Sequence, residues 1–311
     1  MFIPVFFSVI STLLNMITYI REIQLSAIAI FTRIILFFSS EPDQITFDLE
    51  KYKILIGCAV FIFFLIPVCL MKKLRTMAFI SYVSIFFFGL FIIYLIIMFA
   101  YLVKTEGFDP DHSFKLFHLN DRFAKSLSTS LFAFNFYPLT YPGIRHVKNS
   151  TSSNILKIFG ITLIIILINY IVVGLFSYLT FFDKNMNGTV LDHFPENTKF
   201  EKILIVIGRI VSFVFVLFTL PFRLNACRYV ILNTINDSSS FPADIWCFLG
   251  IIISLLALVL GNLSDKYLNI LFIFSDVMAS FLLFIFSPLF YLKINGTSDR
   301  FHTVISILFL F

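Results

Sequence analysis

The chain has 311 residues, of which 59% are apolar and only 13% are charged, and its net charge is +5. Soluble domains typically carry about a quarter charged residues. This composition excludes a single water-facing globule and predicts an all-α polytopic integral membrane protein surrounded by membrane lipid. The modest positive charge suits basic loops at one membrane face and gives no reason to expect a nucleic-acid partner.

The first apolar segment, residues 2–38, is interrupted by the charged pair Arg21–Glu22. It predicts either one long tilted helix or a spanning helix over about 2–20 followed by an interfacial helix. Crossing the hydrocarbon core takes about 20 apolar residues, and eight later segments meet or approach that length. They lie at about 54–71, 77–103, 124–144, 155–182, 203–226, 245–263, 268–292 and 301–311.

Short basic loops alternate along the chain with loops of mixed charge. The basic loops at 72–76, 145–154 and 227–242 are therefore expected in the cytoplasm. On that topology the sequon at Asn187 faces the opposite side and is a candidate for glycosylation, whereas the sequon at Asn149 is not.

Residues 131–142, LFAFNFYPLTYP, place two prolines inside an apolar segment. A proline in a spanning helix removes a backbone hydrogen bond, and the freed groups are tolerated only where they face protein or a watery cavity. Secondary transporters place their substrate sites at such broken helices. The alternative is an ordinary proline kink, with Asn135 bonded to a neighbouring helix.

Four motifs in this chain resemble the amino acid/auxin permease family. FAFNFYPLTYP, from Phe132 to Pro142, resembles the F-x-F-x-C-H-P-x-x-x-P pattern of the family's sixth helix. Arg209, the TLP triplet that begins at Thr219, and Arg228 resemble the eighth helix. FIFSPLFYLKI resembles the tenth helix, and IPVCLMKKLRTMAFISYVS resembles the junction between the fourth and fifth. The motifs follow one another in the family's order.

The resemblance implies two inverted repeats of five helices, with the broken first and sixth helices meeting around an amino acid substrate. It covers roughly the third to tenth helices and part of the eleventh, because nothing here resembles the family's first helix. The implied activity is amino acid transport coupled to sodium or protons, in a plasma membrane or a vacuole-type endomembrane. The alternative is a transport-inactive relative or gene fragment that acts as a membrane sensor, scaffold or partner subunit.

The substrate-binding candidates are Phe134, Asn135, Tyr137 and Pro138, because broken helices offer unpaired backbone groups at the place where the family binds substrate. The ion-coupling candidates are Thr219 and Asp276. Thr219 aligns with a threonine that helps hold sodium in sodium-coupled relatives, although a hydroxyl bonded to its own helix is the alternative. Asp276 is an ionisable residue inside a span, which is costly and often functional.

Arg209 is also ionisable within a span and could instead snorkel to the membrane surface. No nucleotide-binding or hydrolase motif is present, so neither an enzyme nor catalytic residues are predicted. The cysteines show no metal-ligand spacing and are interpreted as packing residues, so no metal site or cofactor beyond a coupling ion is expected. They are Cys58, Cys69, Cys227 and Cys247.

Overall fold

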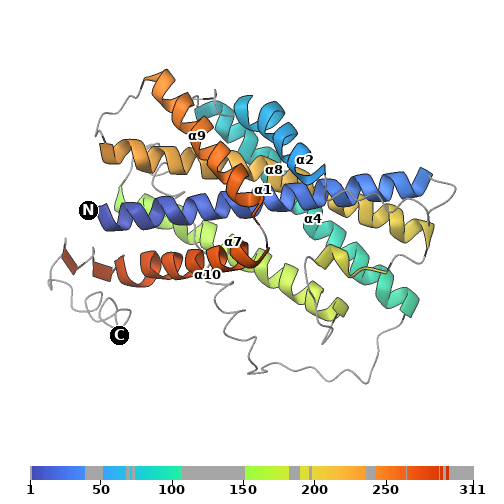
Figure 1. The fold of residues 1–311 in the computed structure, drawn as a ribbon. Helices are drawn as coiled ribbons and strands as arrows, with labels where there is room; N and C mark the ends of the chain where they lie inside the picture. Colours follow the sequence, from blue (N-terminus) through green and yellow to red (C-terminus); the bar gives the residue numbers. More distant parts are fainter. Residues whose placement is uncertain are drawn as a thin grey trace.

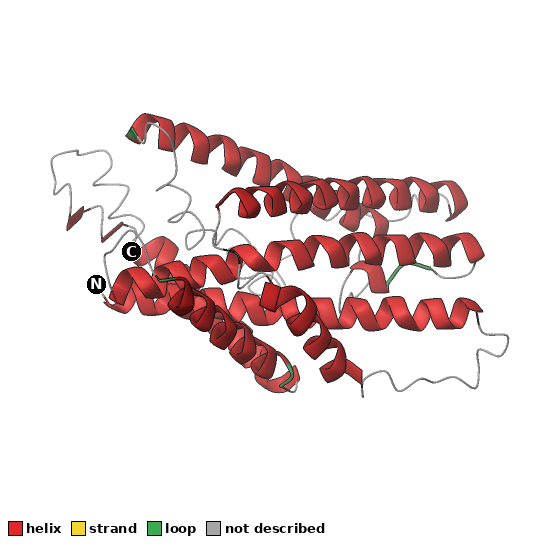
Figure 2. Cartoon of the chain, turned by 90° about the horizontal axis from the view of Figure 1, so that it is seen from above, coloured by secondary structure: helices red, strands yellow, loops and turns green. Residues whose placement is uncertain are grey.

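The structure is a computed structural model that describes residues 2–38, 52–67, 71, 74–106, 151–181, 190–195, 198–235, 242–263, 265–286, 288–289 and 292–293. The regular structure in these ranges is helical and includes no strand (Figure 2). Five of their helices are long and apolar enough to cross a membrane. The expected all-α polytopic membrane fold is therefore confirmed. The segments predicted at 124–144 and 301–311 lie outside the described residues.

Helix α1 (Phe2–Phe38) is a single continuous helix of 37 residues, so the structure has the one long helix of the two alternatives. At 1.5 Å per residue it is about 55 Å long, well above the roughly 30 Å of a hydrocarbon core. It runs through the middle of the bundle, with α8 along one side and α10 beside its N-terminal half (Figure 1). The other elements are α2 (Lys53–Val60), η3 (Phe61–Leu65), α4 (Leu74–Glu106), α7 (Ser152–Phe181), η4 (Val190–Asp192), α8 (Lys199–Ile235), α9 (Ala243–Gly261), α10 (Asp265–Ser280) and η5 (Phe281–Phe286).

Two helices widen into π-helical turns just before a proline. The η3 turns follow α2 and precede Pro67, and the η5 turns follow α10 and precede Pro288. A proline ring collides with the carbonyl four residues earlier in an α-helix, and in both segments that carbonyl lies inside the π turns. The N–H of Ile66 bonds to the carbonyl of Phe61, five residues back, which is the widened pattern. The prolines account for both departures from α geometry.

Helices α4 and α8 run antiparallel along most of their length. As residue numbers rise along α4, those of the contacting residues fall along α8. The contacts join Ser84 to Thr219, Phe88 to Phe215, Tyr94 to Gly208 and Tyr101 to Glu201. Helix α8 therefore presents one face to α4 over several turns, and the side chains at opposite ends of that face lie far apart in the bundle.

The N-terminus of α8 is capped by a reciprocal pair of side chains. The N–H of Glu201 donates to Oγ1 of Thr198 at 3.2 Å, and the N–H of Thr198 donates to Oε2 of Glu201 at 3.0 Å. This capping box satisfies backbone donors that a helix start leaves without partners. At its other end α8 continues to Ile235, with Pro221 inside it, and so extends past the expected boundary at 226.

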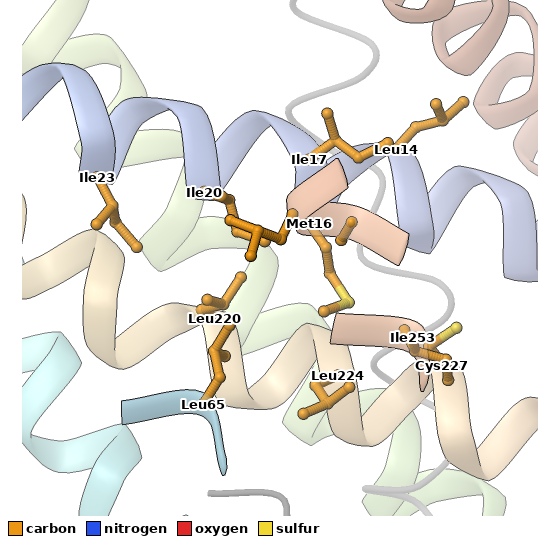
Figure 3. Packing of buried hydrophobic residues seen from close by; sticks show 12 residues of the cluster. Leu14, Met16, Ile17, Ile20, Ile23, Leu65, Leu220, Leu224, Cys227 and Ile253 are labelled. Atoms are coloured by element: carbon orange, nitrogen blue, oxygen red, sulfur yellow. The ribbon is translucent and has the colours of Figure 1, made fainter. Parts of the chain in front are cut away.

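Aliphatic side chains from α1, α8, α9 and η3 form the main buried cluster (Figure 3). Met16 and Ile20 of α1 point toward Leu224 and Leu220 of α8 in the close view. Lipid tails are as apolar as these residues, so close van der Waals packing holds the helices together, and burial from water adds little. The complementary shapes of these side chains therefore set how α1 sits against α8.

Arg228 attaches α9 to the C-terminal half of α8. Its side chain is fully buried, and Nη1 donates to the backbone oxygen of Trp246 at 3.3 Å. Its guanidinium carbon also lies 4.6 Å from the centroid of the Trp246 ring, a cation–π distance. The arginine at the end of the TLP-containing motif therefore has a packing role in this fold.

Candidate functional site

One face of α1 carries polar side chains over several turns. The residues recur every three or four positions, the spacing that places side chains on one face of a helix. We call this set the polar face of α1. It comprises Ser8, Ser11, Thr12, Asn15, Tyr19, Glu22 and Ser26. Five of them are buried, and Tyr19 and Glu22 are half-buried. A polar surface of this length is uncommon inside a membrane bundle, where polar residues are costly and often functional.

Several groups of the polar face bond to the backbone of α1 itself. The hydroxyl of Thr12 donates to the carbonyl of Ser8 at 2.7 Å, and Nδ2 of Asn15 donates to the carbonyl of Ser11 at 2.8 Å. Each bond uses one side-chain donor and leaves the oxygen lone pairs of Thr12 and Asn15 as acceptors. These two residues therefore add hydrogen-bond acceptors to the polar face.

Halfway along α1 the polar face meets a cation from α8. Nη2 of Arg223 donates to the Tyr19 hydroxyl at 3.4 Å, and the guanidinium lies 5.6 Å from the centroid of the Tyr19 ring. Tyr170 of α7 interacts electrostatically with both groups. A tyrosine and an arginine from two helices thus pair halfway along α1, with a third polar group of α7 within electrostatic range.

Thr219 lies one helical turn before Arg223 on α8 and two residues before Pro221. Its hydroxyl donates to the carbonyl of Phe215 at 2.8 Å, which is the self-bonded arrangement weighed in the sequence. The same oxygen also lies 2.8 Å from the hydroxyl of Ser84 on α4. Thr219 therefore forms an interhelical contact as well as a bond to its own helix.

A charged cluster lies nearer to the N-terminus of α8. Arg209 is 3% exposed and pairs through Nη2 with Asp192, which lies in the short helix η4. Glu22 of the polar face interacts electrostatically with both residues. Arg209 is therefore buried and ion-paired, and the interpretation that it snorkels to the membrane surface is wrong.

Tyr94 of α4 packs directly over the backbone of α8 beside this cluster. A Cβ atom added to Gly208 would lie 2.3 Å from Cζ of Tyr94, so only a glycine leaves room for the ring. Tyr94 is 4% exposed, and its ring also contacts the rings of Phe91 and Phe194. The ring therefore packs between α4, α8 and the segment that follows η4.

The structure places only part of the predicted site. Phe134, Asn135, Tyr137 and Pro138 lie outside the described residues. Asp276 lies on α10, and only the position of its backbone is described. Thr219 is brought together with Ser84, which the sequence did not single out. Arg209 was singled out by its family motif, but the polar face of α1 was missed. The spacing of Ser8, Ser11, Thr12 and Asn15 is a signal that a helical projection of 2–38 reveals.

The fold and these buried polar groups define a multi-pass integral membrane protein with a polar interior. The model of the transmembrane amino acid transporter protein family matches residues 6–310, and the chain belongs to that family. This agrees with the motifs that resemble amino acid permeases. No solved structure matches the chain.

Proposed function

We propose that the protein moves amino acids across a membrane by secondary active transport with alternating access. The observation that carries this proposal is the polar face of α1, which is largely buried on a helix that runs through the middle of the bundle. A hydrophilic solute needs such groups to replace its water on the way through a membrane. Membership of the amino acid transporter family supports the substrate class. The five-plus-five inverted repeat implied by the sequence motifs remains part of the proposal.

The substrate-binding role is proposed for Phe134, Asn135, Tyr137 and Pro138. The support is the double-proline interruption of the 124–144 segment, which would leave backbone groups unpaired at membrane depth. The amide of Asn135 offers one acceptor and two donors to a zwitterionic amino acid. These residues form the part of the proposal that a substitution tests most directly.

Coupling to an inward flow of Na⁺ or H⁺ is the further step. The hydroxyls of Thr219 and Ser84, 2.8 Å apart, are neutral oxygens of the kind that hold sodium. Asp276, on α10, is the candidate for a residue that carries a proton. The two ions make different demands, because sodium needs oxygen ligands and a proton needs a titratable group.

The test is uptake of radiolabelled amino acids into proteoliposomes that contain the full-length protein. Uptake is measured under an inward sodium gradient, under an inward proton gradient and without either. We expect accumulation under one gradient, and we expect Asn135→Leu to reduce it at least tenfold because the substrate loses a polar partner. The matched control is Asn169→Leu on α7, since among the described residues Asn169 bonds to its own helix, at the carbonyl of Ile165.

Three results would count against the proposal. Uptake equal to empty liposomes for every amino acid would remove transport and favour a sensor, scaffold or partner subunit. An equal loss in the Asn135→Leu and Asn169→Leu variants would show that the effect is not local to the predicted site. Uptake that is independent of both gradients would remove the coupling step alone.

A further inference from the structure

Tyr94 has a buried hydroxyl for which the described residues offer no hydrogen-bond partner. The ring is 4% exposed and lies against Gly208, with Cζ as its nearest atom. The Tyr94 hydroxyl is attached to Cζ, so it lies close to the backbone of α8 at Gly208. Gly208 is the residue before Arg209. Buried polar groups are satisfied in the great majority of proteins, so an unsatisfied one at a helix contact calls for an explanation.

Arg209 contributes a second donor to the same place. Its Nη2 pairs with Asp192, but its Nε is buried and has no partner among the described residues. Arg209 and Tyr94 also interact electrostatically. The hydroxyl and the Nε–H can both donate a hydrogen bond, and the guanidinium is always charged. Two buried donors without acceptors among the described residues, one of them cationic, match a ligand that brings a negatively charged oxygen or a halide.

The charged residues around these two donors also favour an anionic ligand. Arg33 of α1 interacts with Tyr94, and Arg21 and Glu22 of α1 extend the cluster toward Asp192. Among the described residues, the guanidinium groups of Arg21, Arg33 and Arg209 thus act on this region, and their field favours an anion. The side chain of Asp192 is 43% exposed, so the cluster reaches the surface of the described structure at that residue.

We propose that Tyr94 and Arg209 form a binding site for one singly charged anionic group at the contact of α4 with α8. The group is the carboxylate of an amino acid or an inorganic anion such as chloride. It accepts hydrogen bonds from the Tyr94 hydroxyl and from Nε of Arg209, while Nη2 stays paired with Asp192. The carboxylate form rests on the proposed amino acid transport; the inorganic form does not.

The test uses the purified full-length protein in detergent and a buffer whose anion is a bulky sulfonate. Each proteinogenic L-amino acid, its α-carboxamide (in which a neutral amide replaces the carboxylate), and sodium chloride are titrated separately, and Kd is obtained from the rise in unfolding temperature. The variants are Tyr94→Phe, which removes only the hydroxyl, and Arg209→Lys, which keeps the charge without Nε. The control is Tyr101→Phe on the same helix, whose hydroxyl already bonds to Glu201 at 3.2 Å.

We expect binding of an amino acid but not of its carboxamide, with Kd raised roughly tenfold in Tyr94→Phe and in Arg209→Lys. Ligand-free Tyr94→Phe should unfold at the wild-type temperature or above it, because no hydrogen bond is lost. Tyr101→Phe should leave Kd unchanged. If chloride alone gives the shift that depends on Tyr94, the ligand is an inorganic anion.

Wild-type Kd values in both Tyr94→Phe and Arg209→Lys, for every amino acid and for chloride, would overturn the site. The liposome assay separates this failure from failure of transport. If uptake is unchanged in Tyr94→Phe and no binding depends on Tyr94, the transport proposal stands and the anion site is refuted. If anion binding depends on Tyr94 but no amino acid is taken up, the site binds an inorganic anion and the transport proposal is refuted.

Discussion

At the scale of single residues, the contact between α4 and α8 depends on the pairing of the smallest residue with a large one. Gly208 leaves the space that the Tyr94 ring occupies, and the ring would collide with any Cβ at position 208. Tightly packed interiors tolerate added atoms poorly because neighbouring side chains must leave their preferred rotamers. The missing side chain of Gly208 is therefore as important for this contact as the aromatic ring.

The Gly208→Ala variant should be destabilised by about 1–3 kcal/mol, the usual cost of adding a methyl group to a well-packed site. The measurement is the unfolding midpoint in a detergent titration. Gly174→Ala on α7 is the control, since a Cβ there meets no other atom within 4 Å. Alanine is the better helix former, so the control should be as stable as wild type or more so. Equal stability of the two variants would contradict the packing argument.

The sequence singled out some residues that form contacts between elements, and their functional roles stay predictions. Thr219 and Arg209 were singled out because they match a family motif, and both lie at interhelical contacts. Their partners Ser84 and Asp192 could not be named, because each pair is joined only when separate segments pack together. Tyr94 was missed for the same reason. An aromatic residue in an apolar helix carries no local sign that its hydroxyl will be buried beside an arginine.

At the scale of elements, α8 contacts both α1 and α4 and holds much of the bundle together. Its face toward α4 includes the hydroxyl pair of Thr219 and Ser84, near the middle of α8 and in the N-terminal half of α4. Interhelical hydrogen bonds in membranes contribute modestly, since the separated helices also find other partners for these groups. This pair therefore aligns the two helices more than it stabilises them.

A double-mutant cycle with Ser84→Ala and Thr219→Ala should give a coupling energy of about 0.6 kcal/mol, the average for such bonds in a membrane protein. Unfolding free energies of the four proteins supply the measurement. The control cycle pairs Ser84→Ala with Thr234→Ala, because Thr234 lies farther along α8 and bonds to the carbonyl of Val230 at 2.8 Å. That cycle should be additive. Additivity in the first cycle as well would show that the two hydroxyls do not interact.

Which segments form helices was largely predictable, but their internal geometry was less so. Length and apolar content predicted the helical segments because these properties are local. They left open whether residues 2–38 form one helix or two, and the structure has one, α1. The π turns of η3 and η5 were not predicted, although Pro67 and Pro288 are the local cause that accounts for them.

At the scale of the whole molecule, the helix directions determine which termini share a membrane face. Helix α8 runs antiparallel to α4, so the C-terminal end of α8 and the N-terminal end of α4 lie at the same end of the bundle. The loop predicted at 72–76 adjoins the N-terminal end of α4, but Arg228, the only basic residue of the loop predicted at 227–242, is buried within α8. The packing therefore places these two helix ends at one end of the bundle, and their cytoplasmic position stays a prediction from the sequence.

The topology predicts that Asn187 is glycosylated when the chain is made in a eukaryotic secretory membrane. Endoglycosidase treatment should then increase the gel mobility of the wild-type protein, and Asn187→Gln should abolish that shift. Asn149→Gln should leave it intact, because residue 149 lies in a loop assigned to the cytoplasm. Loss of the shift in Asn149→Gln but not in Asn187→Gln would mean that the orientation is reversed.

The sequence by itself determined that the protein lies in a membrane, that its fold is helical and which family it resembles. Composition, apolar length and short motifs are properties of neighbouring residues. Only the tertiary structure decided which faces are buried together. It placed the polar face of α1 inside the bundle, paired Arg209 with Asp192, and laid Tyr94 over Gly208 beside Arg209. These contacts join residues far apart in the chain or on separate helices. The complementary shapes and charges of whole helices select them, and no local pattern records that choice.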